Sequence, residues 1–370
     1  MRLLVTGGGT GGHVYPALAI VEALLSNDEW GTNPEDVAWV GSADSIEQRI
    51  LAQQGWTFYA VSVGALRGVG PRAALRNLGR MRQGYRRSRE LVAHHRPDAV
   101  LATGGYVSVP LVLAARAANC PSLVYLPDMR PGLAVRFLSH FAQRVAVSFE
   151  SAAKYLPRGK VVVSGYPVRQ ALQGVDEQRA RAALSLANQS PALLVFGGSR
   201  GAHSINEAVG KVLEPLLRIA QVVHISGLED YTALARLREN LPGKLKSRYH
   251  LFSYMYEHMA DALAVADLAV ARAGAATLGE FPAVGLPAVL VPYPYAGQHQ
   301  QANAEYLAGH GAAVIVRDAE LGTRLLAVVT ELLADPARLR SMSVAARALA
   351  APEAARTVAR ELFSLAGNRL

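Results

Sequence analysis

The feature that most constrains the fold is a glycine-rich turn near the start of the chain. Leu3-Leu4-Val5 predicts a buried strand, residues 7–12 contain five glycines, and residues 17–25 predict a helix. This order presents free backbone N–H groups and the positive end of a helix dipole to an anion. Glycine lets a phosphate approach the main chain closely. His13 follows the turn directly and can carry a proton near neutral pH, so it is a candidate catalytic group.

Several interpretations of this turn compete. The spacing Gly7-x-Gly9-x-x-Gly12 matches a dinucleotide-binding fingerprint, but that site needs an acidic residue at the end of the second strand, and Asp44 comes late. A P-loop is excluded because no Lys-Ser/Thr pair follows the glycines. A turn with only a structural role stays an alternative. We favour a site for a substrate phosphate.

The same pattern recurs twice. A strand at residues 98–102 leads into Thr103-Gly104-Gly105-Tyr106, and a strand at residues 192–196 leads into Gly197-Gly198-Ser199-Arg200-Gly201. Strand-like and helical runs alternate almost throughout, which predicts an α/β fold with parallel sheets. In such a fold the turns lie at the carboxyl edge of the sheet, where ligands bind.

A polar stretch after residue 165 suggests a domain boundary. We predict an N-terminal Rossmann-like domain over residues 1–165 and a C-terminal one over residues 166–350, the two facing a cleft. Pro352 precedes a last helix, within residues 351–370, which we expect to pack back on the N-terminal domain.

The amino-acid composition limits the cellular compartment and the kind of partner that we expect. The single Cys120 excludes an intramolecular disulfide and is typical of a reducing compartment. No signal peptide and no apolar run of the ~18 residues that a spanning helix needs can be found. The net charge of +9 favours an acidic partner. No nucleic-acid-binding motif is present, so nucleotide phosphates or an anionic membrane surface are favoured.

The strongest concentration of positive charge lies between Arg67 and Arg89. This segment holds eight arginines, and Glu90 is the first acidic residue beside them. Ala74, Leu78, Met81, Tyr85 and Val92 recur at helical spacing on the same segment. Either a core-packed helix carries a solvated arginine face, or a basic amphipathic helix binds anionic lipid headgroups.

Five motifs in this order resemble those of the MurG family within glycosyltransferase family 28. They are Gly8-Gly9-Thr10-Gly11-Gly12-His13, Gly104-Gly105-Tyr106-Val107-Ser108, Gly197-Gly198-Ser199-x-Gly201-Ala202, Arg272-x-Gly274-Ala275-x-Thr277-x-x-Glu280 and His299-Gln300-x-x-Asn303-Ala304. The resemblance implies the two-domain GT-B fold. It also implies inverting transfer of N-acetylglucosamine from UDP-GlcNAc to undecaprenyl-pyrophosphoryl-MurNAc-pentapeptide, at the cytoplasmic face of the cell membrane, without a metal or other cofactor.

The resemblance also assigns roles to individual residues. On the donor side, Ser199 and Arg169 hold the diphosphate of UDP, the main chain near Tyr256 contacts uracil, and Glu280 binds the ribose. Gln300, Ala275 and Thr277 hold the sugar. His13 is the general base. The residues that bind the acceptor, including its pyrophosphate, are Gly9, Thr10, Gly11, Gly12, Gly104, Gly105, Tyr106 and Asp128.

The chain departs from the family pattern in one loop. Where the family usually reads His-Glu-Gln-Asn, this sequence reads Tyr125-Leu126-Pro127-Asp128, and Val135 stands in place of an asparagine. A family-28 transferase with another lipid or small-molecule acceptor is therefore an alternative. A nucleotide-sugar epimerase is disfavoured because it needs no basic patch, and a non-catalytic UDP-sugar-binding protein because it needs no His13.

Overall fold

The structure is a computed structural model that describes residues 1–9, 11–43, 45–64, 70–198, 201–255, 257–295 and 299–367. The chain forms two compact units, residues 1–169 with 351–370, and residues 170–350. Each unit is built on its own parallel sheet, which confirms the predicted α/β fold. Residues 166–169, which the sequence analysis placed in the second domain, lie in the first unit.

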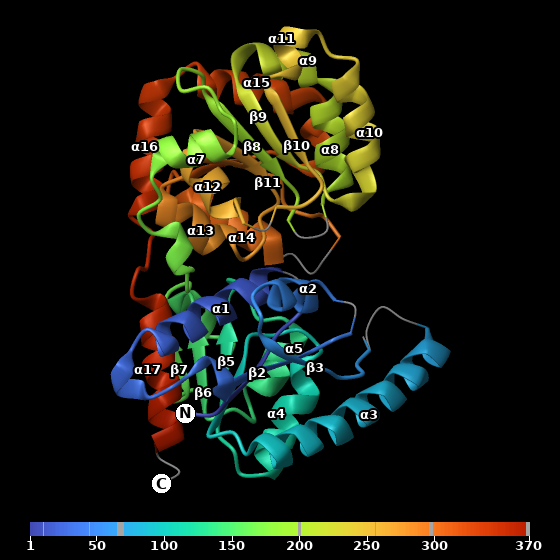
Figure 1. Ribbon diagram of the computed structural model, residues 1–370, viewed down its shortest axis with the longest axis vertical. Helices are drawn as coiled ribbons and strands as arrows, with labels where there is room; N and C mark the ends of the chain where they lie inside the picture. Colours follow the sequence, from blue (N-terminus) through green and yellow to red (C-terminus); the bar gives the residue numbers. More distant parts are fainter. Residues whose placement is uncertain are drawn as a thin grey trace. The chain divides into compact units, whose positions relative to one another are not determined.

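The first unit has a seven-stranded sheet in the order β3-β2-β1-β4-β5-β6-β7, with every strand parallel to its neighbour (Figure 1). Its strands are β1 (Leu3–Thr6), β2 (Val37–Gly41), β3 (Thr57–Ala60), β4 (Ala99–Ala102), β5 (Ser122–Leu126), β6 (Arg144–Val147) and β7 (Val161–Val163). Its helices are α1 (Gly11–Leu25), α2 (Ile46–Gln53), α3 (Pro71–His95), α4 (Ser108–Ala117), α5 (Leu133–Leu138), α6 (Glu150–Ala153) and α17 (Ala354–Gly367), with short 3₁₀ turns η1 (Asp28–Trp30) and η2 (Pro34–Asp36).

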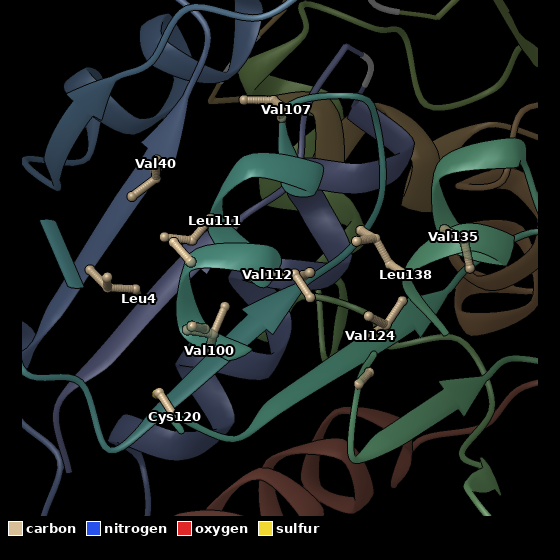
Figure 2. Packing of buried hydrophobic residues seen from close by; sticks show 14 of the residues in the cluster. Leu4, Val40, Val100, Val107, Leu111, Val112, Cys120, Val124, Val135 and Leu138 are labelled. Atoms are coloured by element: carbon tan, nitrogen blue, oxygen red, sulfur yellow. The ribbon is translucent and has the colours of Figure 1, made fainter. Parts of the chain in front are cut away.

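The core of the first unit lies between this sheet and α4. Figure 2 shows Leu111 and Val112 of α4 beside Leu4, Val100 and Val124, which come from β1, β4 and β5. All five side chains are fully or almost fully buried. Side chains alternate along a strand, so every second residue points toward α4. The residues between them are also apolar, which shows that both faces of the sheet are buried. Burial of this kind fixes the strand ends that carry the glycine turns.

Helix α17 returns to the first unit from the end of the chain. It packs against α1 and against strands β4 and β5, and Phe363 stacks on Trp30 with ring centroids 5.9 Å apart. Residues 351–367 therefore contribute to the core that supports the helix carrying His13.

The second unit has a six-stranded sheet in the order β10-β9-β8-β11-β12-β13, again parallel throughout. Its strands are β8 (Ala192–Phe196), β9 (Gln221–Ile225), β10 (Tyr249–Phe252), β11 (Leu268–Ala271), β12 (Ala288–Leu290) and β13 (Ala313–Ile315). Its helices are α7 (Glu177–Ala183), α8 (His203–Lys211), α9 (Leu213–Ile219), α10 (Leu228–Glu239), α11 (Gly243–Lys246), α12 (Met259–Val265), α13 (Thr277–Val284), α14 (His299–Gly309), α15 (Leu321–Leu333) and α16 (Pro336–Arg347), with 3₁₀ turns η3 (Gln170–Leu172) and η4 (Asp318–Glu320). No helix in the described ranges is long and apolar enough to cross a bilayer.

Strand order places the glycine turns in each unit. In the first sheet the direction of winding reverses between β1 and β4, and in the second between β8 and β11. Ligands of open α/β sheets bind at such a reversal, outside the carboxyl ends of the strands. Both glycine turns of the first unit begin there, because Thr6 pairs with Ala102 in adjacent strands.

A buried polar chain crosses the second unit. Asn206 of α8 donates its amide protons to the Ser226 carbonyl and the Asp230 carboxylate, at 2.7 Å each. Its Oδ1 atom must then accept from His224 Nε2, 3.0 Å away, which leaves His224 Nδ1 to accept from the Tyr249 hydroxyl at 2.9 Å. The imidazole is thus held neutral, and burial lowers the pKa of His224 to about 3.

We therefore expect stability to fall in acid partly through His224. The unfolded chain binds a proton at this residue below pH 6.5, whereas the folded chain does so only near pH 3. In that window the unfolded state holds more protons, so the free energy of unfolding decreases as pH falls, by up to ~1.4 kcal/mol per pH unit. The change in melting temperature between pH 7 and pH 4.5 should be smaller in His224→Gln than in wild type. The exposed His310→Gln should behave as wild type, and an unchanged slope in His224→Gln would refute the assignment.

Candidate active site

The two glycine turns of the first unit lie directly against each other. The Gly8 N–H donates to the Gly104 carbonyl oxygen at 3.3 Å. A Cβ atom on Gly105 would lie 2.6 Å from the Gly8 carbonyl oxygen, and Gly105 has a φ of +81°. A side chain at this position would therefore clash and strain the backbone. The turns after β1 and β4 thus form one continuous surface of main-chain groups.

Thr103 joins the second turn to the helix that follows the first. Its hydroxyl donates to the His13 carbonyl oxygen at 2.7 Å, and its side chain is fully buried. Ser108 closes the other side of the turn, donating to the Gly104 carbonyl at 2.7 Å. This contact of Thr103 was not predicted, although a lone polar residue at the end of an apolar strand is a signal for it.

His13 is the third residue of α1, so it is not the cap of this helix. Its imidazole rests on the second glycine turn, since a Cβ atom on Gly104 would lie 2.9 Å from Nε2 of His13. Burial lowers the pKa of His13. The negative charge of Asp128, a hydrogen bond with the Gly8 main chain and the charge of Glu47 oppose this shift in part. The ring is therefore mainly neutral near pH 7 and able to accept a proton.

The loop after β5 completes this edge of the sheet. Asp128 is half-buried and acts electrostatically on both His13 and Tyr125. The Tyr125 hydroxyl is 2.6 Å from Ser148 Oγ, and burial raises the pKa of this phenol. Leu126 is buried at the end of β5.

Val135 of α5 is also buried, and its Cγ2 atom would lie 3.3 Å from a Cβ atom on Gly104. Val135, which stands in place of an asparagine in the family pattern, therefore places an apolar group against the Gly104 turn on which His13 rests.

The structure brings most of the predicted acceptor residues together at one edge. The turn residues next to His13 and the second turn share this edge with Asp128; they are Gly9, Gly11, Gly12, Gly104, Gly105 and Tyr106. Thr10 and Arg67 of the first unit, and Ser199 and Tyr256 of the second, lie outside the described residues.

Arg169 is the last residue of the first unit. Its guanidinium lies over the Tyr15 ring of α1, 4.2 Å from the centroid, and its side chain is nearly buried. The Tyr15 ring in turn covers Gly11, where a Cβ atom would lie 2.9 Å from Cε2. A cation over an aromatic face is held by about 0.5–2 kcal/mol, so Tyr15 orients this arginine.

The donor-side motifs of the second unit also share one edge. The turn after β8 closes with a hydrogen bond of 3.0 Å from the Gly201 N–H to the Gly198 carbonyl. Ala275, Thr277 and Glu280, which follow β11, are almost fully buried. The Thr277 hydroxyl donates to the Gly274 carbonyl at 2.7 Å.

Gln300 lies at the start of α14, where its Oε1 atom accepts from the Tyr293 N–H at 2.9 Å. Several of these donor-side groups thus already have protein partners.

Arg272 ties this edge together. It pairs with Asp318 of η4, donates to Ser204 Oγ of α8 at 2.7 Å and to the Val291 carbonyl at 3.2 Å. Its guanidinium also lies 5.3 Å from the Tyr293 ring centroid. A planar fork with five donors suits such a hub. Within the described ranges, no group of three or more His, Cys, Asp or Glu side chains is arranged to hold a metal ion.

Comparison with known proteins identifies the family to which this architecture belongs. The glycosyltransferase family 28 N-terminal domain matches residues 3–147, and the C-terminal domain of the same family matches residues 192–358. A relative from Roseiflexus sp. (strain RS-1), named UDP-N-acetylglucosamine–N-acetylmuramyl-(pentapeptide) pyrophosphoryl-undecaprenol N-acetylglucosamine transferase, is 41% identical over 100% of this chain and 96% of its own length. A relative of the same name from Desulforudis audaxviator (strain MP104C) is 38% identical over 100% and 99%.

Similar solved structures support the same family. The crystal structure of Acinetobacter baumannii MurG superposes with a TM-score of 0.71 at 29% identity, covering 98% of this chain and 99% of that one. A UDP-GlcNAc 2-epimerase from Neisseria meningitidis gives a TM-score of 0.72 over 98% and 100%, but at 15% identity this likeness concerns the fold alone. The chain therefore belongs to glycosyltransferase family 28, among the MurG transferases, and has the GT-B fold.

Proposed function

We propose that this protein is an inverting glycosyltransferase. It moves N-acetylglucosamine from UDP-GlcNAc to the MurNAc C4 hydroxyl of undecaprenyl-pyrophosphoryl-MurNAc-pentapeptide, a step of peptidoglycan synthesis. The observation that carries the proposal is similarity over the whole chain to transferases named for this donor and acceptor. The clustered glycine turns with a neutral histidine support it from the structure.

The first unit is proposed to bind the acceptor. Residues 1–165 present the N-terminal ends of α1 and α4 at one sheet edge, where backbone N–H groups and helix dipoles favour a pyrophosphate. His13 lies at the same edge and takes the proton from the attacking hydroxyl. Tyr106 and Asp128 flank the acceptor there.

The second unit, residues 170–350, is proposed to bind the donor. The diphosphate of UDP lies at the N-terminus of α8 beside Ser199, with help from Arg169. The main chain near Tyr256 contacts uracil and Glu280 the ribose. The hydroxyl groups of the sugar are bound by Gln300, Ala275 and Thr277. Fixed dipoles and backbone donors then stabilise the departing UDP, the type of electrostatic stabilisation that contributes most in many enzymes.

A second acceptor class is favoured by one observation. Leu126 and Val135 are buried apolar groups where the family pattern has polar residues, and Val135 lies against the Gly104 turn on which His13 rests. A family-28 transferase with another lipid-linked or small-molecule acceptor would tolerate this change. The donor proposal is the same in both cases.

Incubation with radiolabelled UDP-GlcNAc tests the function directly. With a lipid I analogue we expect label in the lipid product and a β-linked sugar by NMR. Label that stays in UDP-GlcNAc with the lipid I analogue, but moves to another polyprenyl-linked sugar, would favour the second acceptor class. Conversion of UDP-GlcNAc alone to its C2 epimer would contradict transferase activity.

Helix α3 is proposed to dock the enzyme on the cytoplasmic face of the membrane. The seven arginines of α3 are exposed, and its first turns extend beyond the rest of the unit (Figure 1). Leu75 and Leu78 are 74% and 56% exposed, so Leu78 does not pack in the core as the first of the two alternatives for this helix requires. Both line a groove of about 520 Å³ between α3 and α4. Exposed leucines among arginines suit the boundary between lipid headgroups and acyl chains.

Charge reversal on α3 should weaken membrane binding. Each arginine near an anionic surface contributes ~1 kcal/mol, so Arg80→Glu/Arg87→Glu should lower affinity for phosphatidylglycerol vesicles by at least roughly 30-fold in sedimentation assays. Wild-type binding should also weaken as salt rises. The control Arg218→Glu/Arg236→Glu changes the net charge equally on exposed sites of the second unit. Equal sedimentation of both double variants would show that α3 is merely a solvated face.

Loss of His13 should affect turnover more than donor binding. A general base contributes ~10²–10⁴-fold, so His13→Ala should lower kcat by that order while the KM for UDP-GlcNAc changes little. Because burial lowers the pKa of His13, the acid limb of kcat/KM should lie below pH 6.5 in wild type and be absent from the variant. His140→Ala, an exposed histidine of the same unit, is the matched control. If His13→Ala keeps its acid limb and most of its kcat, Asp128 becomes the better candidate for the base.

A further inference from the structure

Glu47 is a buried carboxylate beneath the first glycine turn. It is the second residue of α2, whose N-cap Ser45 accepts the Gln48 N–H at 3.3 Å. Its side chain is only 2% exposed. The carboxylate thus lies in the first turn of a helix, where the helix dipole favours negative charge. The reaction as proposed above gives it no role.

The carboxylate lies directly against the main chain of the turn. Its Oε2 atom accepts the Gly9 N–H at 3.4 Å. A Cβ atom on Gly8 would lie 2.3 Å from Oε1, so no side chain fits between them. One of the backbone donors assigned to the acceptor pyrophosphate therefore already points at a fixed anion.

Glu47 also acts on the proposed base. The charged groups that raise the pKa of His13 against burial are Asp128, from the loop after β5, and Glu47, from α2. They approach from two different elements. Asp128 is half-buried, whereas Glu47 is shielded from solvent, so its field is screened less.

We propose that Glu47 is a positioning residue of the acceptor site, which holds the Gly8–Gly9 turn and supplies a permanent negative charge beside the His13 imidazole. This inference rests on the proposed function, because it takes His13 as the base and the turn as the pyrophosphate site. The charge has two opposite effects. The negative charge of Glu47 makes His13 a stronger base, which raises the turnover rate. The same charge repels the acceptor pyrophosphate, which lowers the affinity of the turn for the acceptor.

Glu47→Gln separates charge from shape, because the amide keeps an oxygen that can accept the Gly9 N–H. The acid limb of kcat/KM should move to lower pH, because a charge that raises the pKa of His13 is removed, and the plateau kcat should fall. Inorganic pyrophosphate should compete with the acceptor several-fold more strongly, since a repelling charge is gone. A purely structural Glu47 predicts wild-type behaviour in Glu47→Gln and losses only in Glu47→Ala. An unmoved acid limb, or unchanged inhibition by pyrophosphate, overturns the proposal.

Two further variants keep the test specific. Glu35→Gln removes the same charge from an exposed position before β2 and should leave both quantities unchanged. His13→Ala separates a failure of the proposed base from a failure of the proposed role of Glu47. If the acid limb survives in His13→Ala, the proposed base is wrong. If it is lost there but stays in place in Glu47→Gln, only the role of Glu47 is wrong. Melting curves of each variant show that it is folded.

Discussion

The contact between the two glycine turns of the first unit is the constraint on which its functional edge depends. The Gly8 N–H meets the Gly104 carbonyl, and Gly105 leaves no room for a Cβ atom above the Gly8 carbonyl. Strands β1 and β4 are neighbours at the reversal of winding, so the two turns must come together. The absence of side chains lets His13 settle on main-chain atoms. The same packing leaves this imidazole poorly solvated and therefore neutral.

The second unit reaches a similar edge by different means. There a polar hub does the positioning: Arg272 links Ser204 of α8, Asp318 of η4 and the end of β12. The chain from Asn206 to His224 and Tyr249 anchors α8 to the sheet from within. Buried networks of this kind are stabilising only when every member has a partner, so they fix one arrangement. This rigidity suits the donor diphosphate site that we propose for this edge.

Local patterns in the sequence predicted the parallel strands and their turns, because short apolar runs before glycines leave few alternatives. They did not predict α7, since the stretch around Asp176 is polar and its helix begins with a side-chain cap, Asp176 accepting the Arg179 N–H at 2.7 Å. Leu78 fitted a core-facing period, yet it is exposed and lines an open groove beside α4. Periodicity gives the face of a helix but not the extent of its partner.

The contacts around His13 were harder to foresee. Glu47 and Thr103 lie 34 and 90 residues from His13 in sequence, and only the strand order brings them to it. Glu47 lies outside every glycine motif, and Thr103 stands just before the two glycines of the second turn. The roles of Ser199, Thr10 and Tyr256, outside the described residues, stay predictions from the resemblance, as do the other substrate contacts.

In the proposed mechanism, the paired glycine turns hold a neutral His13 beside the acceptor pyrophosphate. NMR titration of histidine-labelled protein measures this most directly, with His13→Gln to assign the resonance. We expect a His13 titration midpoint below 6.5 in the free protein, which rises when inorganic pyrophosphate is added because an anion stabilises the imidazolium. A midpoint at or above 6.5 that pyrophosphate does not move would contradict it.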